Sequence, residues 1–332
     1  MSGKWKTALV SLSSLLFVAC GGGGGGSGGG TPTLAPLSIT TANAPTVSGE
    51  VVNATDAAEG FGGGGSGTIL AAVTTTGVDR QSLVDVIRSQ LERFSDLQNG
   101  ASSAVVGVVI GPSVFPCAVS GTTTLSGNLA DPATLGPGDN LSATFNSCDE
   151  GDGSILNGGL SMSIGALSGD PAAFPFDLTV AVTLNNLTVI EAGETMTGSG
   201  DISLALSSSD GVTLATTLSG NSLAISGLGS SGALRNYAIT STLNQGTLDY
   251  TLASSGTLES ADLAGSVVFS TPAIFQGIGS GFPYTGAYLI TGQNSSVRLT
   301  ALDDVNVVLE VDDNGDGTVD TTVNTTWVAI SS

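Results

Sequence analysis

Residues 176–184 read Phe176-Asp-Leu178-Thr-Val180-Ala-Val182-Thr-Leu184, so that every second side chain is large and apolar. Successive side chains of a β-strand point to opposite faces, and a period of two therefore predicts a strand with one buried face. The same alternation recurs at residues 202–206 and 305–311. The stretch thus predicts a sheet that buries one face and exposes the other.

Turn signals separate the alternating segments. They are Gly193 after Glu191, Asp210-Gly211, Asn244-Gln245-Gly246 and Gly292-Gln293-Asn294. Short turns rich in Gly and Asn join antiparallel neighbours, and the pattern predicts roughly a dozen strands after the first hundred or so residues. We expect a mainly β (α+β) fold: a long curved antiparallel meander, or a sandwich of two sheets, with one or two N-terminal helices packed on it.

The first of these helices is predicted over residues 44–58. Its apolar side chains recur at helical spacing, and they are Val47, Val51, Ala54 and Ala58. Pro45 suits the first turn, where the missing N–H costs nothing.

The second helix is predicted over residues 80–98. Its apolar stripe consists of Leu83, Ile87, Leu91, Phe94 and Leu97. Asp79 is a candidate N-cap, and Asn99-Gly100 is a candidate stop. The helix also carries Arg80, Arg88 and Arg93. These arginines either form a basic face that docks on anionic lipid, or lie in solvent on a helix that covers the sheet.

The charge composition excludes several classes of chemistry. The 332 residues include 28 Asp or Glu but only 7 Lys or Arg and no His, and both lysines, Lys4 and Lys6, lie at the N-terminus. Without an imidazole there is no Ser-His-Asp site and no His-ligated zinc, and a basic footprint for nucleic acid is missing. Paired carboxylates could still hydrolyse glycosides, but none lies in a recognisable catalytic segment. We expect neither enzymatic activity nor nucleic-acid binding.

The N-terminus has the pattern of an export signal. Residues 1–19 combine two lysines with an apolar stretch that is too short to span a membrane. Phe17-Val18-Ala19-Cys20 resembles the lipobox of bacterial lipoproteins, which implies a lipid on Cys20, and Gly21 after it implies sorting to the outer membrane. Residues 21–30 read GGGGGGSGGG, a flexible tether with an end-to-end distance of about 17 Å. We therefore expect a lipid-anchored protein of the bacterial outer membrane, with the periplasmic or cell-surface side left open.

These patterns divide the chain into four segments. Residues 1–19 are the expected signal peptide and residues 20–35 the lipidated Cys with its tether. Residues 36–100 form a helical segment with an inner glycine-rich loop, and residues 101–332 form the antiparallel β domain.

Two further cysteines, Cys117 and Cys148, remain after Cys20. In an exported protein a disulfide between them is the default expectation. A redox-active pair is the alternative, but the chain lacks CxxC spacing and a nearby base for that chemistry.

The acidic side chains are densest near the C-terminus. The pattern D-x-N-x-D-G-x-x-D begins at residue 312 and offers oxygen ligands at the spacing of a calcium loop, from Asp312, Asn314, Asp316, Thr318 and Asp320. An EF-hand would have Glu at the twelfth position, where this chain has Val323. Two interpretations stay open: a weak calcium site at a hairpin tip, or a solvated turn rich in Asp, Asn and Gly.

Part of the chain resembles a family. The stretches Phe282-Pro-Tyr-Thr-Gly286, Leu289-Ile-Thr-Gly292, Val297-Arg-Leu299, Val311-Asp-Asp-Asn-Gly-Asp-Gly317 and Thr326-Trp327 resemble the C-terminal region of uncharacterised proteobacterial lipoproteins of the outer-membrane type. The segment from Cys117 to Cys148 is similar to another part of those proteins. The resemblance implies an envelope location and a β-rich body, and it implies no activity.

Two functions from different classes fit these expectations. One is a non-catalytic binding or structural module whose Ser- and Thr-rich surface contacts protein or glycan. The other is a periplasmic carrier or chaperone whose curved sheet holds a hydrophobic ligand, a lipid or a lipoprotein, under a helical lid.

Overall fold

A computed structural model describes residues 34–62, 86–87, 89–91, 93, 108–131, 136–151, 153–169, 175–191, 194–227, 230–279 and 281–331. Its helices are α1 (Ala44–Gly62) and α3 (Trp327–Ile330). Its strands are β1 (Val108–Pro116), β2 (Ser120–Leu129), β3 (Asn140–Asp149), β4 (Ser154–Gly169), β5 (Phe176–Glu191), β6 (Glu194–Ser208), β7 (Thr213–Gly227), β8 (Ser230–Asn244), β9 (Asp249–Ser260), β10 (Gly265–Ile278), β11 (Thr285–Gly292), β12 (Ser295–Ala301), β13 (Asn306–Asp312) and β14 (Thr321–Thr326).

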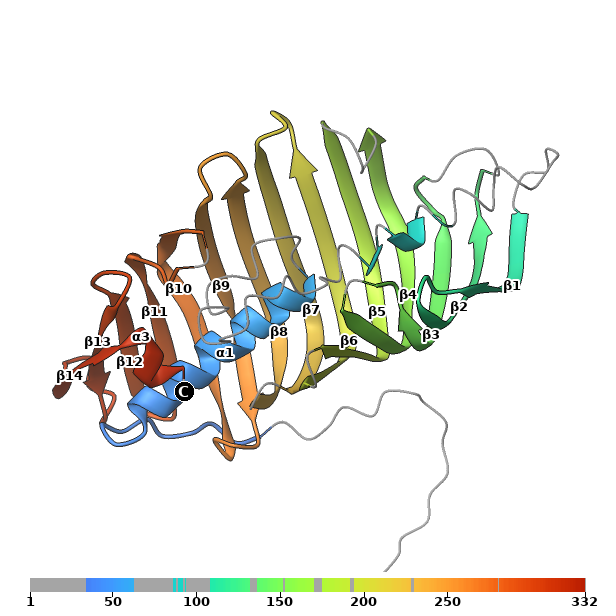
Figure 1. The fold of residues 1–332 in the computed structure, drawn as a ribbon. Helices are drawn as coiled ribbons and strands as arrows, with labels where there is room; N and C mark the ends of the chain where they lie inside the picture. The colour runs from blue at the N-terminus through green and yellow to red at the C-terminus, as the bar shows by residue number, and fades with distance from the viewer. Residues whose placement is uncertain are drawn as a thin grey trace, which may run out of the picture. The chain divides into compact units, whose positions relative to one another are not determined.

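The strands form one antiparallel meander. Each strand pairs with its neighbours in sequence, so that the spatial order runs from β1 to β14 without a crossover (Figure 1). The predicted meander is confirmed, whereas the sandwich alternative is wrong, because among the described strands this continuous pairing leaves none for a second sheet. Alternation reports which face of a strand is buried, but not which element covers it.

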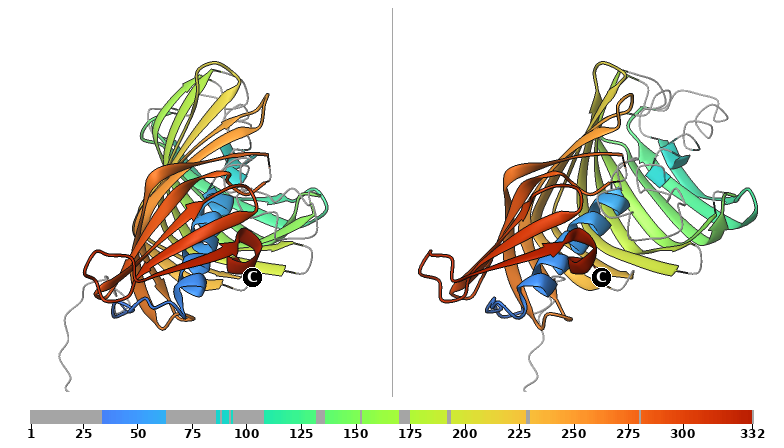
Figure 2. Two further views of the ribbon diagram at one scale, coloured as in Figure 1. Left: turned by 90° about the vertical axis from the view of Figure 1, so that its left-hand side faces the viewer. Right: turned by 60° about the vertical axis from the view of Figure 1, so that its left-hand side comes forward.

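The sheet is curved, and its apolar face is the concave one. In β5 the buried side chains alternate with exposed ones from Phe176 to Leu184, as the sequence predicts. Figure 2 shows the sheet bending around α1, which lies on the concave side. The large apolar side chains of the strands therefore form a core between the sheet and the helix.

Helix α1 confirms the first predicted helix and extends it to Gly62. Its stripe is buried as expected: Val47, Val51, Ala54 and Ala58. The helix contacts strands from β6 to β9, the strands β12 and β13, and α3. None of the helices in the described residues combines the length and apolar character needed to cross a membrane.

Only part of the predicted helix 80–98 is described. Residues 86–87, 89–91 and 93 are helical, and Ile87 and Leu91 of the stripe are buried. The proposed caps and the remaining arginines, Asp79, Asn99, Gly100, Arg80 and Arg88, lie outside the described residues.

A line of β-bulges crosses the sheet from β2 to β9. In β5, Asn186 adopts a φ of 50°, and the pairing with β6 shifts there by one residue. Opposite it in β4, Gly158 has a φ of 84°, and a Cβ at Gly158 would lie 2.0 Å from the carbonyl oxygen of Asn186. Shifts also interrupt the pairing of β2 with β3, β3 with β4, β6 with β7 and β8 with β9, whereas β7 and β8 pair without a shift. Bulges bend strands and increase their twist, so this line accounts for the curvature of long strands that would otherwise lie flatter.

Candidate functional site

The concave face is filled by an aromatic cluster where α1 and α3 meet the C-terminal strands. Trp327 is 1% exposed and stacks on Phe282 at 5.6 Å between ring centroids. Phe275 lies 6.1 Å from Trp327 and 4.7 Å from Tyr288. The Trp327 indole donates hydrogen bonds to the carbonyl oxygens of Pro283 and Asp303. The cluster thus packs the space between helix and sheet, and the buried indole N–H of Trp327 has hydrogen-bond acceptors.

A cavity beside this cluster, between α1 and the sheet, is small. Its volume is about 10 Å³, close to the lower limit for a single water molecule. It is lined by Val52, Thr55, Asp56, Leu252, Phe275, Pro283, Tyr288 and Trp327. At this place between α1, α3 and the C-terminal strands, side chains of the described residues fill the space.

Polar groups are nevertheless buried at this helix–sheet contact. The Tyr288 hydroxyl lies 2.8 Å from the Ser254 hydroxyl. Burial, with a smaller contribution from the nearby acids Glu59 and Asp56 of α1, raises the pKa of Tyr288 to about 12. Glu59 itself is only 1% exposed. The tyrosine therefore stays protonated and serves the packing as a neutral hydrogen-bonding group.

The predicted calcium residues lie on the hairpin between β13 and β14. Asp312 accepts hydrogen bonds from the amides of Gly315 and Gly317 at 2.7 and 2.8 Å. Asp320 accepts from the Asp313 amide at 3.0 Å and from the Asn314 side chain. The carboxylates of this turn thus accept hydrogen bonds from backbone amides of the same turn, as is common for Asp and Asn in turns. The flanking elements are strands, as the sequence predicts.

Two carboxylates of this hairpin have shifted pKa values. Hydrogen bonds from Thr318 lower the pKa of Asp316. The pKa of Asp313 is raised chiefly by a hydrogen bond that its protonated form donates to Asp320. Repulsion from the charges of Asp320 and Asp312 raises it further. This repulsion is one that a bound cation would relieve, and calcium at this hairpin stays a prediction.

The chain enters the fold at the same end of the sheet as this hairpin. Leu37 donates from its amide to Ser266 and accepts from the amide of Gln293. The amide of Ile39 donates to the Ser295 hydroxyl at 2.7 Å. Residues 34–39 are thus fixed beside the turns that precede β10 and β12.

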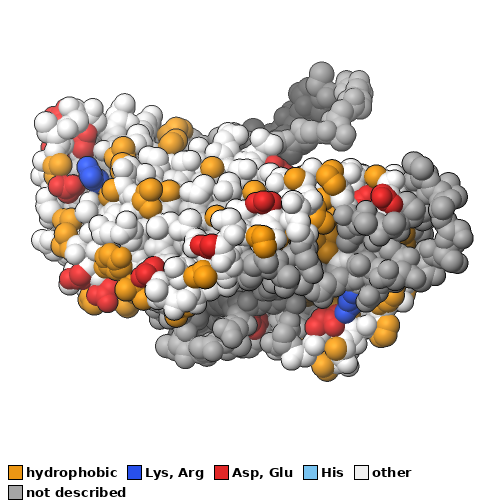
Figure 3. All heavy atoms as spheres, turned by 90° about the horizontal axis from the view of Figure 1, so that it is seen from above, with side chains coloured by type: hydrophobic (Ala, Val, Ile, Leu, Met, Phe, Trp, Pro, Cys, Tyr) orange, Lys and Arg blue, Asp and Glu red, His pale blue; other side chains and the backbone are white. Residues whose placement is uncertain are grey.

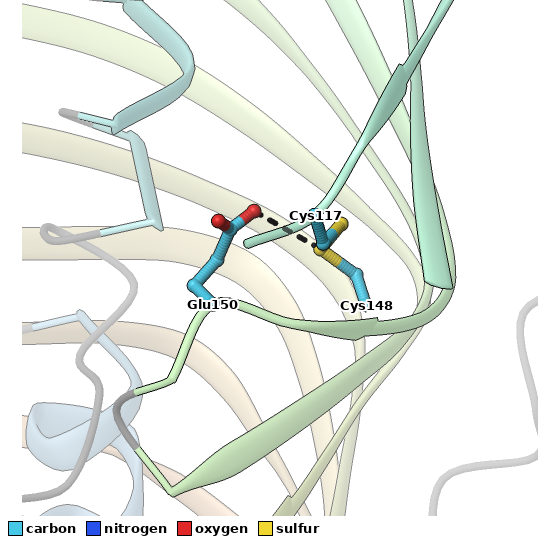
Figure 4. Close-up of side chains that lie close together, drawn as sticks. All are labelled: Cys117, Cys148 and Glu150. Carbon is cyan, nitrogen blue, oxygen red and sulfur yellow. Dashed lines mark hydrogen bonds between the residues drawn. A yellow bond between two sulfur atoms is a disulfide. The ribbon is translucent and has the colours of Figure 1, made fainter. Parts of the chain in front are cut away.

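Cys117 and Cys148 form a disulfide, as predicted, with Cα atoms 5.5 Å apart. It ties the turn after β1 to β3. Glu150 points at this disulfide (Figure 4), and its Oε1 lies 3.2 Å from the Cys148 sulfur. The Thr123 hydroxyl is 3.3 Å from each sulfur. In the described part of the chain, Cys117, Cys148 and Glu150 are the one group of three Cys, Asp or Glu residues whose ligand atoms lie within 4.8 Å of one another.

Arg93 completes this cluster. Its guanidinium pairs with Glu150, whose second oxygen accepts from the Ala118 amide at 3.1 Å. Of the two interpretations of the arginines on helix 80–98, Arg93 thus fits neither, because it forms an ion pair within the fold. Sequence reasoning missed Glu150 and Arg93 as partners; the available signal was an acid two residues after a cysteine.

Other carboxylates of the described chain cap turns. Asp210 accepts from the amides of Val212 and Thr213, and Asp303 accepts from those of Val305 and Asn306. These bonds lower the pKa values of both aspartates. Glu191 and Glu194 pair across the turn between β5 and β6, where the sequence places it. The carboxylates of Asp210 and Asp303 thus serve local structure.

The outer face of β4–β9 carries small, uncharged side chains. Two adjacent rows across these strands consist of Ser163, Ala181, Ser203, Ser219, Ala238 and Ser255, and of Ala166, Thr179, Ala205, Thr217, Thr240 and Ala253. None of these side chains is buried. The space-filling view from above in Figure 3 shows few basic side chains and scattered acidic ones. These two rows form a regular strip without charge, whereas Asp177 and Asp201 lie on the same face of β5 and β6.

Comparison of the chain with protein-family models, curated proteins and solved structures found no match. The expected signal peptide, Cys20 and the glycine tether lie outside the described residues.

Proposed function

We propose that this chain is a lipid-anchored lipoprotein of the bacterial outer membrane, whose folded body is a non-catalytic binding or structural module. The leader, Cys20 and the glycine tether support the anchor. The absence of His from the whole sequence and of Lys after Lys6 argues against catalysis.

The observation that carries the proposal is the filled concave face. Trp327, Phe282 and Phe275 pack the space under α1, leaving about 10 Å³. The strands therefore use their apolar face for their own core. The two rows of small uncharged side chains over β4–β9 are the surface that we assign to contact with a protein or glycan.

Membrane fractionation tests the anchor. We expect the full chain in the outer-membrane fraction and Cys20→Ser in the soluble periplasmic fraction. Cys148→Ser, which changes a cysteine inside the fold, is the matched control and should remain with the membrane. Membrane association of Cys20→Ser would contradict the anchor.

A charge placed on the outer face tests whether this surface binds a protein or glycan. Thr217 and Thr240 lie side by side on β7 and β8 and are exposed, so Thr217→Arg and Thr240→Arg should fold normally. We expect both changes to abolish retention of envelope proteins or cell-wall glycan by the purified chain. Thr322→Arg on the exposed part of β14 is the control, and equal retention by all three variants would contradict the assignment.

One observation favours the carrier as a second candidate. The buried side of α1 includes polar groups, Ser48, Thr55 and Glu59, all at most 1% exposed. Polar groups against an apolar sheet gain less from burial than apolar ones, and the carrier function requires an acyl chain to compete with α1 for the sheet. Native mass spectrometry of the chain released from membranes separates the candidates: a stoichiometric non-covalent lipid supports the carrier, and its absence supports the module.

A further inference from the structure

The cluster around the disulfide has the chemistry of a metal site in one of its two redox states. A dithiol reductant that is itself oxidised to a disulfide can give two electrons and two protons to the Cys117–Cys148 bond. The two thiols then lose their protons to solvent as they bind a metal, beside the Glu150 carboxylate, whose Oε1 already lies 3.2 Å from Cys148. Two sulfurs and one oxygen are a ligand set suited to zinc. We propose that the reduced chain binds one Zn²⁺ through Cys117, Cys148 and Glu150, so that the disulfide and the metal exclude each other.

The backbone geometry accommodates this ion. Bonds of about 2.3 Å place two sulfurs about 3.8 Å apart on a tetrahedral zinc. The Cα atoms of the two cysteines are 5.5 Å apart, and each side chain can separate its sulfur from the other by rotation about Cα–Cβ. The three ligand atoms lie within 4.8 Å of one another. A water molecule completes the tetrahedron.

Charge and hydrogen bonding also suit the metal. Arg93 pairs with Glu150, so the positive charges of Zn²⁺ and Arg93 together balance two thiolates and one carboxylate. The Thr123 hydroxyl is fully buried and lies 3.3 Å from both sulfurs. A donor at that place stabilises thiolates over thiols, and zinc requires thiolates.

Cadmium is a spectroscopic probe for such a site. The experiment uses the full chain with Cys20→Ser, which leaves only the two relevant thiols, reduced by a phosphine without oxygen. Titration with Cd²⁺ should give a thiolate-to-metal charge-transfer band that saturates at one ion per chain, and Zn²⁺ should displace it. Cys117→Ser or Cys148→Ser should abolish the saturable band.

The role of Glu150 distinguishes a folded site from two loose thiols. In the same background, Glu150→Gln should weaken Cd²⁺ binding by about tenfold or more, while Asp177→Asn, an exposed acid on β5, should change nothing. Circular dichroism before and after Cd²⁺ reports the fold, and bound metal should protect both thiols from alkylation. Equal affinity of Glu150→Gln and the parent chain, or no saturable binding by the reduced chain, would overturn the proposal.

Discussion

The two edges of the open sheet are held in different ways. At the β14 end, α1 and α3 bury Trp327 in an aromatic cluster, and the contact is entirely non-covalent. At the β1 end, a disulfide ties the turn after β1 to β3. Val109 and Val114 of β1 remain exposed, and Pro112 and Pro116 stand in this edge strand, where proline discourages pairing with another chain. One edge is therefore stabilised by burial, and the other by a bond that depends on redox conditions.

The largest loss of stability should follow a change in the aromatic cluster at the β14 end, which we call the aromatic edge. Trp327→Ala removes the side chain that touches Phe275, Phe282 and the carbonyls of Pro283 and Asp303, and should lower the free energy of unfolding by about 3–5 kcal/mol. Denaturant titration measures it. Val328→Ala, an exposed neighbour on α3, is the control. A loss for Trp327→Ala no greater than that of the control would mean that the cluster does not hold this edge.

Removal of the disulfide at the β1 end should lower the free energy of unfolding by slightly less. The cysteines are 31 residues apart, and closing such a loop contributes about 3–4 kcal/mol in the chain-entropy model. The double change Cys117→Ala with Cys148→Ala should therefore destabilise by this amount, and hydrogen exchange should accelerate first in β1 and β2. Exchange that accelerates equally across β11–β13 would contradict the separation of the two edges.

A substitution in the line of β-bulges between the two edges should lower the stability by less. Gly158→Ala places a Cβ against the Asn186 carbonyl at positive φ, a strain of about 1–3 kcal/mol. Gly165→Ala in the same strand is the matched control, since its Cβ meets nothing closer than 3.5 Å. Thermal unfolding of the two variants measures the difference, and equal melting temperatures would contradict a required bulge.

Alkaline pH should act on the buried tyrosines. Tyr288 lies in the aromatic cluster, and burial also raises the pKa of Tyr237 on β8 and of Tyr250 on β9. The pKa of Tyr288 rises from 10.0 to about 12 on burial. Because the folded pKa is the higher one, the associated stability is fully present below pH 10 and is lost as pH rises from about 10 to 12. Tyr288→Phe should flatten part of this decline, measured as unfolding free energy against pH. A decline of the same steepness in the variant would assign the effect to other groups.

The acidic hairpin should show the smallest effect. If calcium binds to Asp312, Asn314, Asp316, Thr318 and Asp320, the dissociation constant should be about 10⁻⁴–10⁻³ M, as in extracellular modules. Calorimetry should then give heat that disappears in Asp320→Asn. No heat and no thermal shift at millimolar calcium would leave the hairpin as a self-capped turn.

The sequence predicted the local features of the fold better than the contacts between residues that are far apart in the chain. The alternation at 176–184 and the turns at Asp210-Gly211 and Asn244–Gly246 depend on neighbouring residues, and all are confirmed. The bulge at Asn186 was not predicted, because an Asn between two apolar stretches has the same signature in a bulge as in a turn. Nor could periodicity distinguish one curved sheet from a sandwich, since both bury one face.

The candidate sites show the same limit. The disulfide followed from counting cysteines in an exported chain, which needs no geometry. Arg93 and Glu150 are 57 residues apart, and only folding brings them together. The aromatic cluster likewise joins α1 to residues near the C-terminus, such as Phe282 and Trp327.

Hydrogen exchange of α1 tests the central claim most directly, namely that this helix is a permanent part of the core. The amides of residues 48–58 should exchange only through global unfolding, with the same free energy as those of β11 and β12, with or without added phospholipid. Exchange of α1 at a much lower free energy, while the strands stay protected, would contradict the account and identify the helix as a lid that opens.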